Sequence, residues 1–217
     1  MSVKRDTAAH SPVLVGITGG LGSGKTSVCR ILADMGCAVF EADKVAKDLQ
    51  VKDPDIIAGL KRMFGENVYY KDASGKLALD RPSIALKVFQ EPGVRKQVNE
   101  LIHPKVFRAF QDAVDRAARE GVKILVKEAA ILLESGGDKG LNIVVVVTSD
   151  LEKRIERAMR KGVGSREEIV RRIDAQWPQE KLIKRADFVI ENNGTIKELE
   201  SNTRELYHKI LCAAGSL

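Results

Sequence analysis

The chain has 217 residues, enough for one domain with appendages or for two small domains. Its 36 Lys and Arg residues exceed its 30 Asp and Glu residues, and this excess favours anionic partners. Only 5% of the residues are aromatic and none are interleaved with basic residues, so we expect a small polyphosphate ligand and no nucleic acid. No apolar run approaches the ~20 residues that cross a bilayer, so no membrane span is expected.

Residues 1–12 are polar and lack the apolar stretch of a secretory signal, and we interpret them as a flexible tail. The cysteines Cys29, Cys37 and Cys212 lie far apart and match neither a disulfide framework nor a zinc site. Buried thiols in a reducing compartment are the simplest interpretation, which predicts a cytoplasmic location.

The first predicted elements form a strand–helix–strand unit. Val13–Thr18 is an apolar, β-branched run that ends in glycines, which is typical of a buried strand. A helix is predicted from about Gly24 to Met35, because apolar residues recur at helical spacing and Gly36 follows as a stop. Cys37–Glu41 is predicted to be the next short strand. This spacing is that of a βαβ unit and predicts a parallel sheet.

The pattern over residues 53–120 is mostly helical, with a loop or short hairpin at Val68–Leu79. Three helices are predicted to begin after it, near Arg81, Gly93 and Pro104. We interpret 53–120 as an insertion in a sheet protein, whose core then comprises residues 13–52 and 121–217.

Strand signals return after the insertion, at Lys123–Val126, Leu141–Thr148 and Phe188–Ile190. Two pairs have the spacing of helix capping boxes, Ser149 with Glu152 and Ser165 with Glu168. The helix after Ser165 is predicted to carry Ile169, Ile173 and Trp177 on one stripe. A last helix is predicted from about Thr195 to Cys212.

Residues 19–26 read GGLGSGKT, which satisfies the phosphate-loop pattern G-x-x-x-x-G-K-[ST] between a predicted strand and a predicted helix. Glycines allow positive φ angles that turn successive N–H groups toward phosphate oxygens, and the positive end of the helix faces the same anion. Lys25 is predicted to contact the β- and γ-phosphates, and the Thr26 hydroxyl to ligate Mg²⁺. The predicted nucleoside triphosphate site comprises Gly20, Gly22, Ser23, Gly24, Lys25, Thr26 and Ser27.

The chain lacks the N-K-x-D motif of guanine-specific switch proteins, and Leu141–Thr148 leads to Ser149 rather than to the Asp-Glu pair of a motor ATPase. A small-molecule kinase remains, and such an enzyme needs a carboxylate near the γ-phosphate. Asp43 follows the second predicted strand, at the sheet edge where ligands bind. The alternative interpretation is that Asp43 caps a helix at Lys44–Leu49.

Two segments, residues 18–26 (TGGLGSGKT) and 41–46 (EADKVA), resemble the T-G-G-[IL]-G-S-G-K and D-A-D-x-[IV]-A motifs of dephospho-coenzyme A kinases. Further matches follow in the family's order, at Asp80-Arg81, Val88-Phe89, Ile102-His103-Pro104, Ile131–Gly136, Arg172-Ile173, Ala175-Gln176, Lys181, Ala186-Asp187 and Ile190–Gly194. The resemblance covers about residues 13–199. It implies a P-loop NTPase fold with three α/β/α layers around a central parallel sheet, a helical acceptor-binding insertion, and a helical lid at about 150–178.

Members of this family phosphorylate the ribose 3′-hydroxyl of dephospho-coenzyme A with ATP, giving coenzyme A and ADP in the final step of coenzyme A biosynthesis. The resemblance implies that Asp43 is the catalytic carboxylate, Lys25 contacts the phosphates, and Arg157 is a lid cation that neutralises developing charge. It also implies that His103 and Arg108, together with Asp43, bind the acceptor. The implied cofactor is Mg²⁺, the implied partners are ATP and dephospho-coenzyme A, and we expect a monomer or a small homo-oligomer.

The chain departs from the family pattern at four places. Glu41 replaces the first Asp of D-A-D, Ala130 replaces the Pro that precedes the Ile131–Gly136 match, and the other two concern the acceptor site and the lid. The Arg expected four residues after His103 is Phe107, with Arg108 next, so the acceptor contact would shift by one residue. The second lid cation is either Arg160 or Lys161. A lone His before Pro is also typical of a helix boundary. Two other functions stay open: a kinase of another small acceptor, such as a nucleoside monophosphate or a shikimate-like alcohol, and a non-catalytic nucleotide-binding regulator.

Overall fold

The computed structural model describes residues 11–214, so nearly all of the predicted tail, 1–12, lies outside the described residues. The chain forms two compact units: unit 1 takes the residues through Glu41 and those from Val114 onward, and unit 2 takes Ala42–Ala113. Unit 2 starts and ends earlier than the predicted insertion, 53–120. Unit 2 begins at Ala42 because α2 (Ala42–Lys52) packs against two elements of this unit, α3 (Pro54–Phe64) and β4 (Leu77–Leu79).

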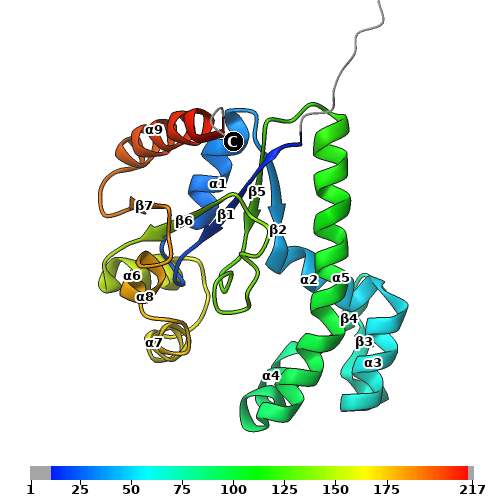
Figure 1. Ribbon diagram of the computed structural model, residues 1–217. Coiled ribbons are helices and arrows are strands. Elements are labelled where there is room, and N and C mark those ends of the chain that lie inside the picture. The colour runs from blue at the N-terminus through cyan, green and yellow to red at the C-terminus, as the bar shows by residue number, and fades with distance from the viewer. Residues whose placement is uncertain (1–10, 215–217) are drawn as a thin grey trace, which may run out of the picture. The chain divides into compact units, whose positions relative to one another are not determined.

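Unit 1 is built on a five-stranded parallel sheet of order β2-β5-β1-β6-β7 (Figure 1). Its strands are β1 (Val13–Thr18), β2 (Ala38–Glu41), β5 (Ile124–Glu128), β6 (Ile143–Thr148) and β7 (Phe188–Glu191). Each coincides, to within two residues at either end, with a predicted apolar run. Ile17 of β1 pairs with Glu128 of β5 and Val145 of β6, so the carboxyl ends of the central strands are aligned. The predicted parallel sheet is confirmed.

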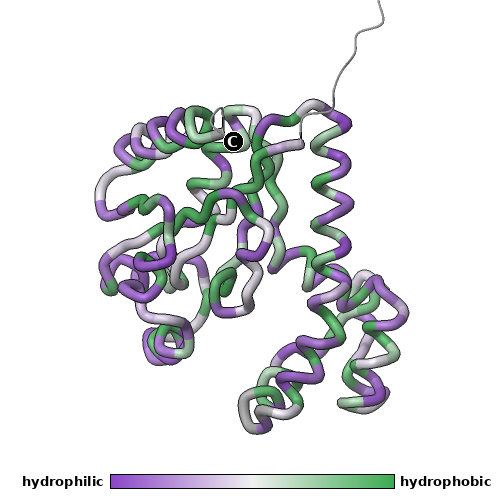
Figure 2. Tube along the Cα trace, in the orientation of Figure 1, coloured by the Kyte–Doolittle hydropathy of each residue, from purple (hydrophilic) through white to green (hydrophobic). Residues whose placement is uncertain are grey.

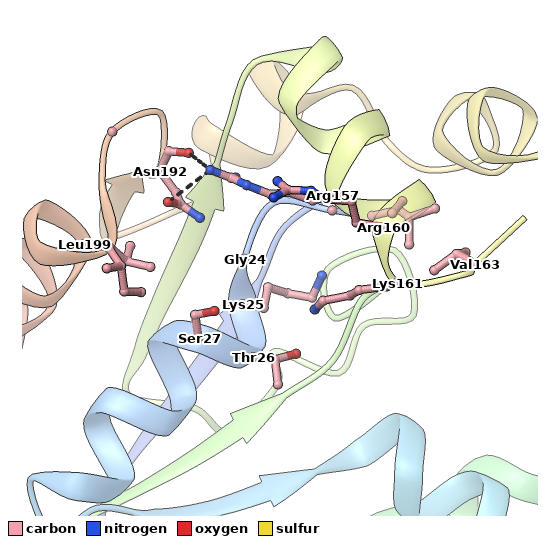
Figure 3. Close-up of a pocket in the computed structure, with 15 residues that line it drawn as sticks. Gly24, Lys25, Thr26, Ser27, Arg157, Arg160, Lys161, Val163, Asn192 and Leu199 are labelled. Atoms are coloured by element: carbon pink, nitrogen blue, oxygen red, sulfur yellow. Dashed lines mark hydrogen bonds between the residues drawn. The ribbon is translucent and has the colours of Figure 1, made fainter. Parts of the chain in front are cut away.

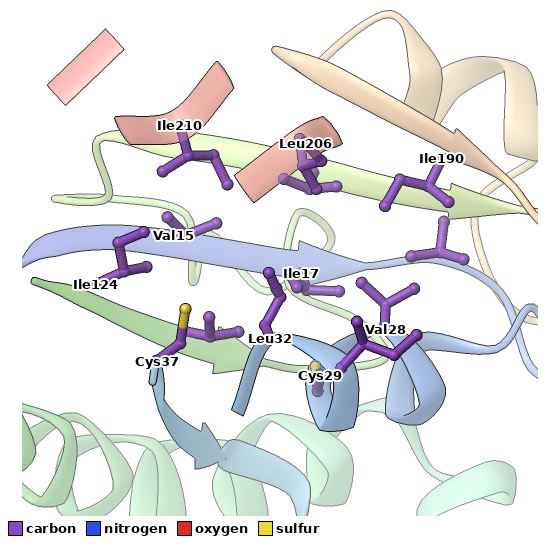
Figure 4. Close-up of a cluster of buried hydrophobic side chains, with 14 of the residues drawn as sticks. Val15, Ile17, Val28, Cys29, Leu32, Cys37, Ile124, Ile190, Leu206 and Ile210 are labelled. Carbon is purple, nitrogen blue, oxygen red and sulfur yellow. The ribbon is translucent and has the colours of Figure 1, made fainter. Parts of the chain in front are cut away.

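One face of this sheet is covered by α1 (Lys25–Asp34) and α9 (Ile196–Ala214), which also contact each other. Leu32 of α1 and Ile210 of α9 are fully buried against Val15 of β1 (Figure 4). Figure 2 shows the matching pattern, because α9 alternates between hydrophobic and hydrophilic residues whereas the central strands are hydrophobic. The apolar spacing of both helices is thus explained by this face of the sheet.

Beyond β6, α6 (Leu151–Arg160) and α7 (Arg166–Asp174) form a helical pair. They share a small apolar core of Ile155, Ala158 and Ile169. The capping box predicted at Ser165 is confirmed. The box predicted at Ser149 is wrong, because α6 begins one residue later, after Asp150, and the Ser149 hydroxyl lies 2.9 Å from the carbonyl oxygen of Asn192. A tertiary contact therefore replaces the local cap.

The other face of the sheet is covered in part by α8 (Gln179–Ile183), whose Leu182 packs against Val144 and Val146 of β6. This second layer explains why every residue of β6 is buried. Trp177 joins the same cluster, so its predicted place on the α7 stripe is wrong: α7 ends at Asp174. Helices on both faces confirm the predicted three-layer α/β/α fold.

Unit 2 is mostly helical, as predicted, and contains the predicted hairpin. Its remaining elements are a short 3₁₀ helix (Glu66–Val68), β3 (Tyr69–Lys71), α4 (Arg81–Gln90) and α5 (Pro92–Arg119), the last of which continues into unit 1. The separate helix predicted near Pro104 is wrong, because α5 runs through this residue. An interior proline loses its own N–H bond and crowds the carbonyl group four residues before it, yet α5 continues past Pro104 despite this cost. Within residues 11–214, no helix combines the length and apolar character that a membrane crossing requires.

The cysteines give a test of the packing in unit 1. Cys29 and Cys37 are buried, and Cys212 is exposed. Burial raises the pKa of the Cys37 thiol to about 11, and burial followed by the Glu128 carboxylate raises the pKa of Cys29 as well. Because only the thiolate reacts, we expect iodoacetamide at pH 8 to modify Cys212 roughly 100-fold faster than the other two. Peptide mass spectrometry measures these rates, and rapid labelling of Cys37 in the folded protein would contradict the packing described.

Candidate active site

The phosphate loop lies between β1 and α1, where the sequence predicts it. Gly19, Gly22 and Gly24 have φ angles of 147°, 78° and 104°, which residues with a side chain rarely adopt. Gly24 takes the N-cap position of α1 and offers no side chain to cap it. The positive end of α1 therefore faces the loop without a capping group, which suits an anionic ligand.

Lys25 is the first residue of α1 and only 9% of its surface is exposed. Its ammonium group donates hydrogen bonds to the carbonyl oxygens of Gly19 (2.8 Å) and Gly20 (3.3 Å). These bonds hold the positive charge against the loop, where it was predicted to meet the phosphates.

A pocket of about 660 Å³ opens beside the loop (Figure 3), a size typical of small-molecule sites. Its walls come from three segments of unit 1: Leu21–Ser27 without Ser23, residues of α6 and the turn after it, and residues after β7. The wall carries four cationic side chains and no carboxylate; the cations are Lys25, Arg157, Arg160 and Lys161. Such a wall suits a polyphosphate. Of the predicted nucleotide-binding residues, the wall includes Gly22, Gly24, Lys25, Thr26 and Ser27.

The other two predicted residues, Gly20 and Ser23, do not line this pocket. Ser23 is fully buried, and its hydroxyl has no hydrogen-bond partner in the described part of the chain. Its carbonyl oxygen accepts a bond from the side-chain amide of Asn192 (2.8 Å). A Cβ atom on Gly20 would overlap the guanidinium group of Arg154. Both residues thus pack against the side chains that support the loop.

Thr26 follows Lys25 and is exposed, with its hydroxyl at the pocket (Figure 3). Among residues 11–214, no three or more His, Cys, Asp and Glu side chains are grouped to hold a metal ion. Mg²⁺ in kinases is commonly held by one or two protein oxygens together with phosphate oxygens and waters. Thr26 fits that kind of site, in which the nucleotide supplies most of the ligands.

The cations of α6 approach the pocket from the side opposite α1. Arg157 donates to the Ser149 hydroxyl (3.0 Å) and to the carbonyl oxygen of Asn192 (2.9 Å), so its guanidinium group is held at the pocket wall. Figure 3 shows the amino groups of Lys25 and Lys161 directed into the same pocket. The helical pair predicted as a lid therefore brings at least two cations, Arg157 and Lys161, to the phosphate loop.

Three side chains that support the loop had no predicted role. Arg154 Nε donates to the Leu21 carbonyl oxygen (2.9 Å), and the Leu21 N–H donates to Gln176 Oε1 (2.8 Å). Asn192 holds Ser23, as described above. Gln176 and Asn192 lie in segments that match family motifs, which was a signal for them. Arg154 had no such signal, because it is one of several charged residues in α6.

Asp43 is the second residue of α2, which begins directly after β2. Its side chain is exposed in the first turn of the helix. The alternative interpretation, a cap for a helix beginning at Lys44, is therefore wrong. The role of Asp43 as the catalytic carboxylate stays a prediction.

His103 and Arg108 both lie on α5 in unit 2, and both are exposed. His103 is inside this helix, so its interpretation as a helix-boundary residue is wrong. Phe107, four residues further on, lies on the same face of the helix as His103. Arg108 lies about 140° around the helix axis from His103, at 100° per residue. Their contact with an acceptor stays a prediction.

The family model CoaE, described as dephospho-CoA kinase, matches residues 13–198. The dephospho-CoA kinase of Chlorobium chlorochromatii is 56% identical over 200 residues, which cover 92% of this chain and 94% of that protein. The enzyme of the same name from Chlorobaculum tepidum is 52% identical over 203 residues, covering 94% and 97%.

A solved structure shares the fold. The crystal structure of TT1252 from Thermus thermophilus has a TM-score of 0.78 and 31% sequence identity, and the match covers 92% of this chain and 98% of that one. The phosphate loop, the parallel sheet and these likenesses agree with one another. The chain belongs to the dephospho-CoA kinase family and is a P-loop kinase.

Proposed function

We propose that this kinase transfers the γ-phosphoryl group of ATP to the ribose 3′-hydroxyl of dephospho-coenzyme A. The products are coenzyme A and ADP, and the reaction is the final step of coenzyme A biosynthesis. The observation that carries the proposal is the phosphate loop, with Lys25 beside a pocket walled by cations, in a member of this family.

The triphosphate of ATP would lie along the loop, with its oxygens facing the loop amides and Lys25. Arg157 would neutralise the charge that develops on the transferred group. Of the two candidates for a second lid cation, Lys161 is favoured because its amino group is directed into the pocket that contains Lys25. Mg²⁺, held by the Thr26 hydroxyl and phosphate oxygens, supplies further neutralisation of the phosphates when bound.

Asp43 would orient the ribose 3′-hydroxyl and accept its proton as the oxygen attacks the γ-phosphorus. The bond from that phosphorus to the bridging oxygen breaks, and ADP leaves with the electron pair. His103 and Arg108 are the proposed acceptor contacts on α5, and Phe107 offers an apolar surface beside His103. We propose a cytoplasmic location, as the cysteine pattern of the sequence suggests.

An acceptor panel tests this function. The purified chain is given ATP and Mg²⁺ with dephospho-coenzyme A, AMP, shikimate or no acceptor, and ADP release is measured. We expect release with dephospho-coenzyme A alone, and coenzyme A as the product in mass spectrometry. Transfer to AMP or shikimate instead would identify another kinase. ATP binding without transfer to any acceptor would indicate a regulator.

A further inference from the structure

Leu21 occupies an x position of the general phosphate-loop pattern, and α6 and the segment after α7 hold it through three different groups. Its side chain packs against the apolar core shared by α6 and α7. Its carbonyl oxygen accepts a hydrogen bond from Arg154 Nε (2.9 Å). Its N–H group donates to Gln176 Oε1 (2.8 Å). The two peptide groups around this residue are therefore clamped on both sides.

A buried arginine at position 154 is energetically unfavourable. Only 8% of its surface is exposed, and burial lowers the pKa of its guanidinium group. It does not line the pocket, and within residues 11–214 its guanidinium group makes one hydrogen bond, the bond to Leu21. Burying a cation is unfavourable unless it is well paired, and an apolar side chain of similar size is often equally stable or more stable. Stability alone thus gives a weak account of Arg154.

The loop and α6 are also in the closest contact that glycine allows. A Cβ atom on Gly20 would overlap the guanidinium group of Arg154, and one on Gly22 would overlap the Arg154 backbone. On the other side of Leu21, Gln176 Nε2 lies 3.5 Å from the carbonyl oxygen of Ala130, soon after β5. Gln176 is therefore itself bonded to the segment after β5, and the guanidinium group of Arg154 is packed against Gly20.

We propose that Arg154 and Gln176 are positioning residues for phosphoryl transfer, a role that rests on the proposed function. Through their hydrogen bonds to the carbonyl oxygen and the N–H group of Leu21, they set the shape of the phosphate loop and hence the direction of its amides. Arg157 lies one helical turn after Arg154 on α6. The same clamp therefore fixes the loop amides and this lid cation relative to each other, and small displacements of such groups reduce catalysis strongly.

The variants Arg154→Met and Gln176→Met each remove the hydrogen bond to Leu21 and keep an unbranched side chain. We expect each to lower kcat about tenfold, the loss of one such bond. The KM for dephospho-coenzyme A should stay near its wild-type value, because neither residue lies in unit 2, which carries the proposed acceptor contacts. In nucleotide-free protein, amide hydrogen exchange over residues 19–24 should become about tenfold faster, with exchange in β6 unchanged.

Arg171→Met is the matched control, because Arg171 is exposed on α7 and contacts neither the loop nor the pocket. It should leave both readouts at wild-type values. In the double variant, kcat should fall by less than the product of the two single effects, since both residues act on one peptide segment.

Two results would overturn the clamp: wild-type exchange in the loop of both variants, or a fall in kcat that is matched by a fall in the denaturation midpoint. The second would mark a purely structural role. If Arg154→Met does not fold, the same measurements of kcat and loop exchange on Gln176→Met still test the proposal. If the wild-type chain releases no ADP with dephospho-coenzyme A, the proposed function fails. Hydrogen exchange in the loop then still tests whether Arg154 and Gln176 hold Leu21 in place.

Discussion

We expect the replacement of Asp43 by Asn to lower kcat with dephospho-coenzyme A about a thousandfold and to leave the affinity for ATP near its wild-type value. Asn has the shape of Asp but cannot take the proton of the ribose hydroxyl. Asp43 is exposed in the first turn of α2, so the change does not alter a buried side chain. Steady-state ADP release measures kcat, and calorimetry with a non-hydrolysable ATP analogue measures nucleotide affinity.

Asp48→Asn is the matched control for this variant. Asp48 is exposed on the same helix and forms a surface ion pair with Lys52 (3.0 Å), which contributes little to stability. We expect its kcat to equal that of the wild type. A kcat for Asp43→Asn within about threefold of the wild type would exclude Asp43 as the base, because general bases contribute far more.

We expect the replacement of Lys25 by Met to lower kcat by about 10²- to 10³-fold and, unlike the change at Asp43, to weaken ATP binding as well. The ammonium group would contact the phosphates in the ground state as well as during transfer. It also donates to the carbonyl oxygens of Gly19 and Gly20, so its loss removes two contacts that hold the loop. The same two measurements separate this pattern from that of Asp43→Asn.

Lys184→Met controls for loss of a lysine in unit 1, since Lys184 is exposed at the end of α8 and lies outside the pocket wall. It should retain wild-type kcat and ATP affinity. Unchanged ATP affinity in Lys25→Met would contradict the assignment of this pocket to the triphosphate.

The elements that local patterns determine were predictable from the sequence. The strands of the sheet, the hairpin of unit 2 and the capping box at Ser165 depend on neighbouring residues, and all are present. The errors occur where distant contacts outweigh local preference. Ser149 bonds to Asn192 in place of a cap, Trp177 packs on α8, and α5 continues through Pro104.

The same distinction applies to the site. The phosphate loop was predictable because its residues are consecutive. The side chains that support it come from 133 to 169 residues further along the chain, at Arg154, Gln176 and Asn192. Gln176 and Asn192 lie in segments that match family motifs, but no pattern in the sequence shows that they or Arg154 contact the loop, because only the folded sheet brings these groups together.

The hydrogen bonds of Arg157 have a consequence for nucleotide affinity. Its guanidinium group already donates to Ser149 and Asn192, so any move toward a phosphate exchanges these acceptors for anionic oxygens. Only the difference between the two sets of bonds then contributes to ground-state affinity. An arginine that is already hydrogen-bonded in the nucleotide-free enzyme therefore binds ADP less tightly than an arginine without acceptors would. Weaker binding favours release of ADP, which suits an enzyme that must turn over repeatedly.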